Sequence, residues 1–176
     1  PGHPAPARSD YTGLSAPTPP AQASAGIATA DGHHPPNIKG MGLVSEIFTY
    51  DVLAKLPGNM AIRHTRYSPT GDSALLNAQP IRVDSTKGLI AIAHNGNLVN
   101  LGNLRTRLER DGAYFQTTYD SEIIVQLLAH SRAGTPVDAI ADSLTHGHGT
   151  LSLVLMTPAP CFARARPACA RRRAVR

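Results

Sequence analysis

The sequence has no long run of apolar residues, although 41% of its 176 residues are hydrophobic. A helix that crosses a bilayer needs about 20 consecutive apolar residues, and the opening stretch PGHPAPARSD has no apolar segment typical of a secretory signal. We therefore expect a soluble, cytoplasmic protein that has no membrane partner. The length is sufficient for one hydrophobic core and short for two, so we expect a single folded domain.

Cysteine is scarce as well. The chain has two cysteines, Cys161 and Cys169, and both lie near its C-terminal end. A pair in this position favours neither a disulfide framework nor a zinc site. The histidine pairs at 33–34 and at 146–148 have no carboxylate or cysteine nearby at ligand spacing. We therefore interpret these histidines as loop residues and expect no bound metal.

Acidic residues are few, with 12 against 17 basic ones, and the formal net charge is +5. Six arginines lie between residues 161 and 176, and subtracting them leaves −1 for the rest of the chain. This tail has one aromatic residue, Phe162, and no nucleic-acid-binding motif around it. We expect a basic, disordered tail over residues 158–176 and no nucleic-acid partner. Phosphate contacts by the tail alone are the alternative.

Apolar runs predict three strands, and proline limits where others can form. The runs are NMAIRHTRYS at 59–68, GLIAIA at 88–93 and GTLSLVLM at 149–156, and the last two read as strands buried on both faces. Prolines concentrate in residues 1–23 and 33–36, where they oppose central strands because they donate no backbone hydrogen bond. We expect residues 1–23 to be poorly ordered.

Helical spacing of apolar residues predicts three helices. In the first, over residues 100–112, Asn100 can cap the start and Gly112 can end the helix in a left-handed conformation. The second covers 119–132 with Asp120 or Ser121 at its start, and the third covers 136–146. The fold class expected from strands and helices together is α+β. The residues expected on the apolar faces are, in order, Leu101, Leu104 and Leu108; Ile123, Ile124, Leu127 and Leu128; and Val137, Ile140, Ala141 and Leu144.

Two polar clusters, in IRHTRYSPTG (62–71) and IAHNGNL (92–98), contain the candidate site residues. Arg66 can hold a carboxylate with two parallel hydrogen bonds, and Asp120 at a helix start can accept from an ammonium group, so the pair can bind an α-amino acid. The Asn95 amide and the Gly96 N–H can converge on one oxygen as an oxyanion hole. Two alternatives stay open: Arg66 as a surface ion pair, and Asn95-Gly96 as a hairpin turn.

Several segments in the same order resemble the N-terminal glutaminase domain of the amidophosphoribosyltransferase family, across about residues 24–157. They are SAGIATADG, KGMGLVSEIF, LAKLPGNMAIRHTRYSPTG, NAQPIRV, IAHNGNLVN, FQTTYDSEI and LSLVLMTP. The resemblance implies an N-terminal-nucleophile hydrolase fold, a four-layer sandwich of two antiparallel sheets between helices, here incomplete. It also implies the activity: a glutamine amidotransferase of purine biosynthesis, whose glutaminase domain releases ammonia from L-glutamine for phosphoribosylamine synthesis from phosphoribosyl diphosphate.

Carried over to this sequence, the resemblance assigns the same roles as the side-chain chemistry. Arg66 would bind the α-carboxylate of glutamine and Asp120 its α-amino group, while Asn95 and Gly96 would form the oxyanion hole. His64 and Tyr67, which complete the motif H-x-R-Y-S, are expected to pack in the core. Members of the family are homo-oligomers; their magnesium ion and, in some members, their iron–sulfur cluster belong to regions that the resemblance does not cover, so no cofactor is expected here.

The sequence also departs from the family pattern. The family nucleophile is an N-terminal cysteine whose own α-amine acts as base, but residue 1 is Pro1, which has neither thiol nor hydroxyl. Residues 19–24 read PPAQAS where the family reads H-R-G-Q-E-S, and Pro69 replaces a threonine that contacts glutamine. Resemblance ends after LVLMTP, and no phosphoribosyltransferase domain follows. We therefore expect a fragment or degenerate copy, truncated at both ends, that does not turn glutamine over.

Two related functions stay open as alternatives. One is a glutaminase domain of another class II amidotransferase, such as glucosamine-6-phosphate synthase or asparagine synthetase, although KGMGLV and TTYDSEI fit the purine enzyme better. The other is a non-catalytic module that binds glutamine without hydrolysing it.

Overall fold

A computed structural model describes Ala7, Tyr11 and residues 22–30, 36–67, 75–85, 88–117, 119–157 and 162–165. The strands are β1 (Gln22–Ala30), β2 (Asn37–Met41), β3 (Met60–Tyr67), β4 (Ile81–Ser85), β5 (Gly88–Leu98), β6 (Gly149–Met156) and β7 (Phe162–Ala165). The helices are α2 (Val44–Ile47), α3 (Tyr50–Ala54), α4 (Leu101–Arg110), α5 (Asp120–His130) and α6 (Pro136–His146), with a 3-10 turn η1 (Leu75–Asn77).

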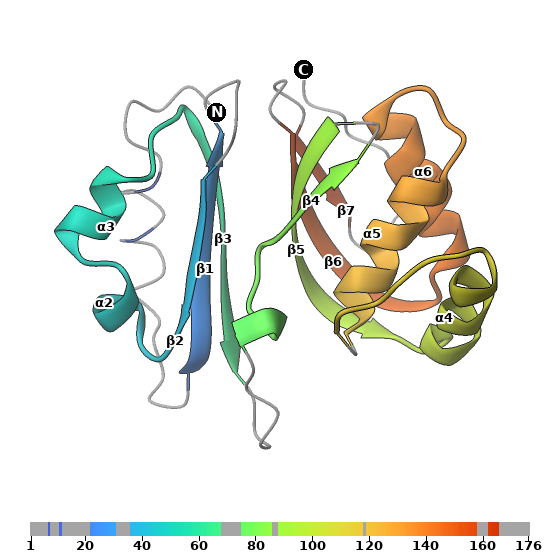
Figure 1. Cartoon of the computed structure of the whole chain (residues 1–176), viewed down its shortest axis with the longest axis horizontal. Coiled ribbons are helices and arrows are strands. Elements are labelled where there is room, and N and C mark those ends of the chain that lie inside the picture. The colour runs from blue at the N-terminus through green and yellow to red at the C-terminus, as the bar shows by residue number, and fades with distance from the viewer. Residues whose placement is uncertain are drawn as a thin grey trace.

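The strands form two antiparallel sheets that face each other (Figure 1). The first has the order β2-β1-β3 and the second the order β4-β5-β6-β7. Helices α2 and α3 cover the outer face of the first sheet, and α5 and α6 cover that of the second (Figure 1). The α+β class with two antiparallel sheets is therefore confirmed. No helix in the described ranges is long and apolar enough to cross a membrane.

Of the four apolar cores in the described residues, one packs α4 against α5, and three hold these layers together. Between the sheets, small side chains such as Ala28, Ala91 and Ala93 meet larger ones from β3 and β6, because alternate residues of a strand point to the same face. Outside the first sheet, Phe48 and its neighbours cover β1. The remaining core joins the second sheet to its helices and includes Ile90, Ile92, Ile124, Val125, Leu128, Ile140, Leu153 and Leu155.

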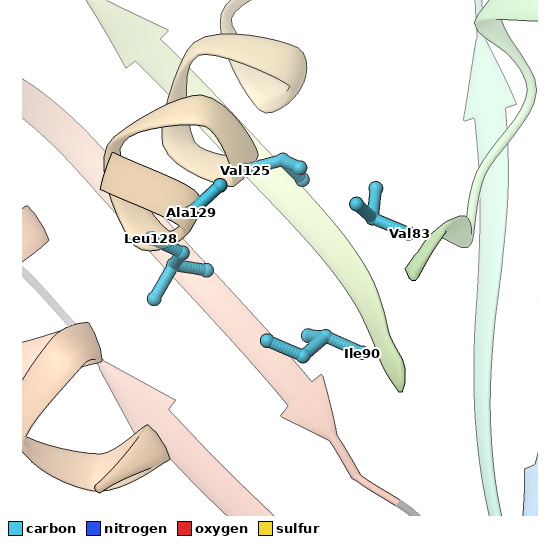
Figure 2. Close-up of a pocket in the computed structure, with 5 residues that line it drawn as sticks. All are labelled: Val83, Ile90, Val125, Leu128 and Ala129. Atoms are coloured by element: carbon cyan, nitrogen blue, oxygen red, sulfur yellow. The ribbon is translucent and has the colours of Figure 1, made fainter. Parts of the chain in front are cut away.

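A small cavity lies in this last core, between α5 and the second sheet (Figure 2). Its volume is ≈ 10 Å³, which is about the space of one water molecule. The lining is apolar and consists of Val83, Ile90, Val125, Leu128 and Ala129. A cavity of this size and lining offers no site for a polar substrate.

All three predicted strands and all three predicted helices are present, and the differences lie in their ends and faces. β5 continues to Leu98, because residues from His94 onward pair with β6. Asn95 and Gly96 consequently lie inside a strand, and the hairpin-turn interpretation was wrong. The Asn100 side chain does not cap α4; it bonds instead to His146 O (2.8 Å) and His148 N (2.9 Å).

Two other expectations need correction. In α6, Val137 is exposed, and Ala139 and Ser143 are buried in its place, because the helix turns a different face toward the sheet than the apolar pattern indicated. Within the tail expected to be disordered, residues 162–165 form β7 on the free edge of β6, since backbone pairing needs no apolar side chain. β1 likewise begins at Gln22, inside the stretch 1–23 that was expected to be poorly ordered. Most of residues 1–23 and 158–176 lies outside the described residues.

Candidate functional site

Arg66 lies near the end of β3 and points toward the second sheet. Met60 and Ile62 of the same strand are buried between the sheets, and strand alternation places His64 and Arg66 on that face. The Arg66 guanidinium stacks over the Tyr119 ring at 4.3 Å from the ring centroid. Its Nη1 is buried and has no hydrogen-bond partner in the described part of the chain. A buried cationic donor left unpaired is costly unless a ligand completes it.

The start of α5 carries Asp120 directly after Tyr119. The loop before it is held by Glu122, whose carboxylate accepts hydrogen bonds from Gln116 N (2.8 Å), Thr117 N (2.7 Å) and Thr117 Oγ1 (2.7 Å). These bonds fold the loop back over the first turn and fix its entry into the helix. The positive end of the helix dipole also favours a carboxylate at this point.

His94 of β5 connects this helix start to the predicted oxyanion segment. Its side chain is 1% exposed, and its Nδ1 lies 3.2 Å from Asp120 Oδ1. Ser121 Oγ lies 3.4 Å from the same nitrogen and is its hydrogen-bond partner. Nε2 is buried and finds no hydrogen-bond partner within the described ranges. Sequence reasoning missed His94 as a site residue. The signal that was available is a single imidazole that interrupts the apolar run of β5 just before Asn95.

The backbone of His94 is held by the side chain of Gln79. Gln79 Oε1 accepts from His94 N at 2.6 Å, and Gln79 Nε2 donates to His94 O at 3.1 Å. β4 pairs with β5 only as far as Ile92, opposite Ile81. The Gln79 amide therefore replaces a strand neighbour at His94, and it fixes the chain immediately before Asn95.

The first sheet in turn holds the segment that carries Gln79. Lys39 Nζ donates to Ala78 O at 2.8 Å, and Asn37 Nδ2 donates to Pro80 O at 2.9 Å; burial lowers the pKa of Lys39. At Gly26 of β1, a Cβ atom would overlap the Gln79 carbonyl oxygen. β1 and β2 thereby contribute to the position of a segment that belongs to the other sheet.

Asn95 and Gly96 follow in β5, and both are exposed. Gly96 has φ +155°, a conformation that other residues rarely adopt. A Cβ atom here would overlap Thr150 O on β6 and would lie 3.0 Å from His94 Nε2. Glycine is thus required both by the close approach of β6 and by the His94 ring.

The structure brings the predicted site residues together through two links. Arg66 meets the start of α5 at Tyr119, and Asp120 meets β5 at His94, next to Asn95. Tyr67, the last residue of β3, is 43% exposed, so its expected place in the core was wrong. Residues 68–74, including Pro69, lie outside the described residues. The described residues include no group of three or more potential ligands that could hold a metal.

His64 has the clearest electrostatic perturbation near the site. Burial lowers its pKa to about 4, with further repulsion from His94 and Arg66. In the unfolded chain its pKa is about 6.5, so the unfolded state takes up a proton first as the pH falls. Neutral His64 makes its full contribution to the free energy of unfolding above pH 6.5. This contribution is lost between about pH 6.5 and 4, by up to about 3 kcal/mol.

We therefore expect the free energy of unfolding to fall more steeply below pH 6.5 in the wild-type chain than in His64→Gln. Urea unfolding at several pH values between 4 and 7 measures this slope. His130→Gln is the matched control, because His130 is exposed on α5 and its removal should leave the slope unchanged. Equal slopes for the wild type and His64→Gln would contradict the assignment.

Comparisons with known proteins identify the family of the chain. Residues 64–169 match the family described as "Glutamine amidotransferase domain". The chain is 43% identical over 152 residues to the amidophosphoribosyltransferase of Methanocaldococcus jannaschii, covering 85% of this chain and 32% of the relative. It is 51% identical over 114 residues to that of Homo sapiens, covering 62% and 22%. The chain thus spans a third or less of the length of these curated relatives.

A solved structure agrees as well. The chain is similar to the glutamine phosphoribosylpyrophosphate amidotransferase of B. subtilis complexed with ADP and GMP, with a TM-score of 0.86 and 36% identity. The similarity covers 94% of this chain and 35% of that one. On the sequence and the fold together, the chain belongs to the glutamine amidotransferase domain family and corresponds to the glutaminase domain of the amidophosphoribosyltransferases of purine biosynthesis.

Proposed function

We propose that this domain binds L-glutamine where β3, β5 and the start of α5 meet, and that it serves the release of ammonia from the glutamine side chain. The observation that carries the proposal is Arg66 Nη1, a buried donor for which the described residues offer no partner, beside a helix start that bears a carboxylate. The α-carboxylate of an amino acid pairs with Arg66 through charge-assisted hydrogen bonds. Its α-ammonium group pairs with Asp120.

The chemistry of the proposal follows from the remaining residues. With the α-carbon held by Arg66 and Asp120, the side-chain amide of glutamine reaches toward β5. The Asn95 side chain and the Gly96 N–H there stabilise the negative charge that forms on the amide oxygen during attack. In the proposed whole enzyme, of N-terminal-nucleophile hydrolase type, the ammonia converts phosphoribosyl diphosphate to phosphoribosylamine.

The attack itself needs a thiolate with an adjacent base, and in this type of enzyme the α-amine of the nucleophile is that base. Pro1 offers an amine without a thiol. A polypeptide made of these 176 residues is therefore expected to bind glutamine and to release no ammonia from it. Isothermal titration calorimetry and an enzymatic ammonia assay on the same preparation measure the two properties separately.

Two analogues make the calorimetry specific. 4-Aminobutanamide keeps the side-chain amide and the amine but lacks the α-carboxylate, so it should not bind, because Arg66 has no partner in it. 4-Carbamoylbutanoate lacks the α-amine and should bind more weakly than glutamine. A folded chain that gives no binding heat with glutamine would overturn the proposal. Ammonia release that disappears in Arg66→Ala would leave the glutamine site standing and disprove the expected lack of turnover.

A further inference from the structure

We propose that His94 is a positioning residue of the glutamine site, which holds the Asp120 carboxylate in the orientation that receives the α-ammonium group. The inference rests on the proposed glutamine site, and it assigns a function to a residue outside the set predicted from sequence. It is carried by three observations: the confinement of the His94 ring, the distance from its Nδ1 to Asp120, and the orphaned Nε2.

The imidazole has no freedom to move away from Asp120. Its side chain is 1% exposed, and the Gln79 amide holds the His94 backbone by both its N–H and its C=O. A Cβ atom on Gly96 would lie only 3.0 Å from Nε2, so any residue other than glycine would press on the ring. A side chain confined in this way can hold a neighbouring group, here the Asp120 carboxylate, in a defined orientation.

The contacts of the ring select one tautomer. A proton on Nδ1 lies next to Asp120 Oδ1, 3.2 Å away, where it attracts the carboxylate. A proton on Nε2 would leave a buried N–H without an acceptor among the described residues, and it would set the Nδ1 lone pair against a carboxylate oxygen. The hydrogen-bond partner of Nδ1 is Ser121 Oγ, at 3.4 Å, which can accept the same proton. His94 therefore carries its proton on Nδ1, between Ser121 Oγ and the Asp120 carboxylate.

This contact prepares the carboxylate for its ligand. With Oδ1 held next to the His94 Nδ1 proton, the remaining oxygen, Oδ2, keeps one orientation at the start of α5. A carboxylate that is already oriented loses less rotational freedom when it binds an ammonium group. Arg66 stacks on the preceding residue, Tyr119, so the groups for the α-carboxylate and the α-ammonium both lie at the start of α5. In an α-amino acid these two charged groups are attached to one carbon.

Two isosteric variants test the proposal. The amide nitrogen of asparagine takes roughly the place of imidazole Nδ1, whereas that of glutamine takes the place of Nε2. Glutamine affinity, measured by calorimetry on the 176-residue chain, should stay within about threefold of the wild type in His94→Asn and fall about tenfold or more in His94→Gln. His130→Asn, at an exposed histidine of α5, is the control and should bind as the wild type does.

The tautomer gives a second readout that does not depend on ligand binding. Long-range ¹H–¹⁵N NMR of the wild-type chain should show the His94 proton on Nδ1. Suppose that Arg66→Ala abolishes binding, so that the glutamine site stands. A His94 proton on Nε2, or equal affinities in His94→Asn and His94→Gln, would then overturn the proposal for His94. A wild-type chain that is folded and does not bind glutamine would instead disprove the proposed function; the tautomer would still decide whether His94 orients Asp120.

Discussion

Replacing Arg66 with alanine is expected to lower the affinity for glutamine about 100-fold or more, because two charge-assisted hydrogen bonds to the α-carboxylate are lost together. The stability of the fold should change much less, since Arg66 Nη1 has no hydrogen-bond partner among the described residues. The fold does lose the packing of the guanidinium against Tyr119. Calorimetric titration with glutamine, alongside thermal unfolding of the same variants, measures both quantities.

Two matched variants sharpen this expectation. Arg63→Ala removes an arginine from the same strand at an exposed position on the other face, and it should bind glutamine as the wild type does. Arg66→Lys keeps the charge but cannot make two parallel bonds, so its affinity should lie between those of Arg66→Ala and the wild type. If Arg63→Ala and Arg66→Ala weaken binding equally, the weaker binding comes from the loss of one positive charge at either position. Arg66 is then not the carboxylate ligand.

Gly96→Ala is expected to lower the free energy of unfolding by about 3 kcal/mol or more. The added methyl group would overlap the Thr150 carbonyl oxygen of β6, and a backbone at φ +155° strains any residue with a Cβ by roughly 1–3 kcal/mol. Relief would require β5 and β6 to separate where they pair. Equilibrium unfolding in urea gives the free energy of unfolding for this comparison.

The control for this substitution is another glycine of the same chain. Gly102 lies in α4, is exposed, and has no atom within 4 Å of the place where a Cβ would lie. Alanine there should raise the free energy of unfolding by up to about 1 kcal/mol, because glycine is a poor helix former. A Gly96→Ala variant as stable as Gly102→Ala would show that β5 and β6 do not approach as closely as the structure has them.

The two substitutions also separate the contributions of side chain and backbone to the site. Arg66 supplies a side-chain group for the ligand, so its loss is expected to weaken binding with little change in the fold. Gly96 supplies an N–H and the space around it, so its replacement should disturb the strand pairing together with the site. Agreement with the first expectation would place the recognition of the α-carboxylate on β3. Agreement with the second would confirm the close approach of β6 to β5 at Gly96.

The spacing of apolar residues was enough to predict the helices and strands in which that spacing is regular. α5 and α6 were predicted close to their observed limits, because their apolar residues recur at helical spacing, and β6 was predicted over its exact range. β1 and β2 were not predicted from periodicity, since β1 consists largely of small residues and β2 is short and only partly buried. Their order in the sheet depends on contacts between segments distant in sequence.

Residue types and their local spacing were sufficient to predict the α+β class, the resemblance to the amidophosphoribosyltransferases, and Arg66 and Asp120 as candidate ligands. The place of Asn95 and Gly96 inside β5 follows from tertiary contacts, since pairing with β6 extends the strand past its apolar run. The roles of His94 and Gln79 were likewise visible in the structure and not in the sequence, because their neighbours are distant in sequence. A polar side chain acquires a partner, or is left without one, when distant segments are packed around it.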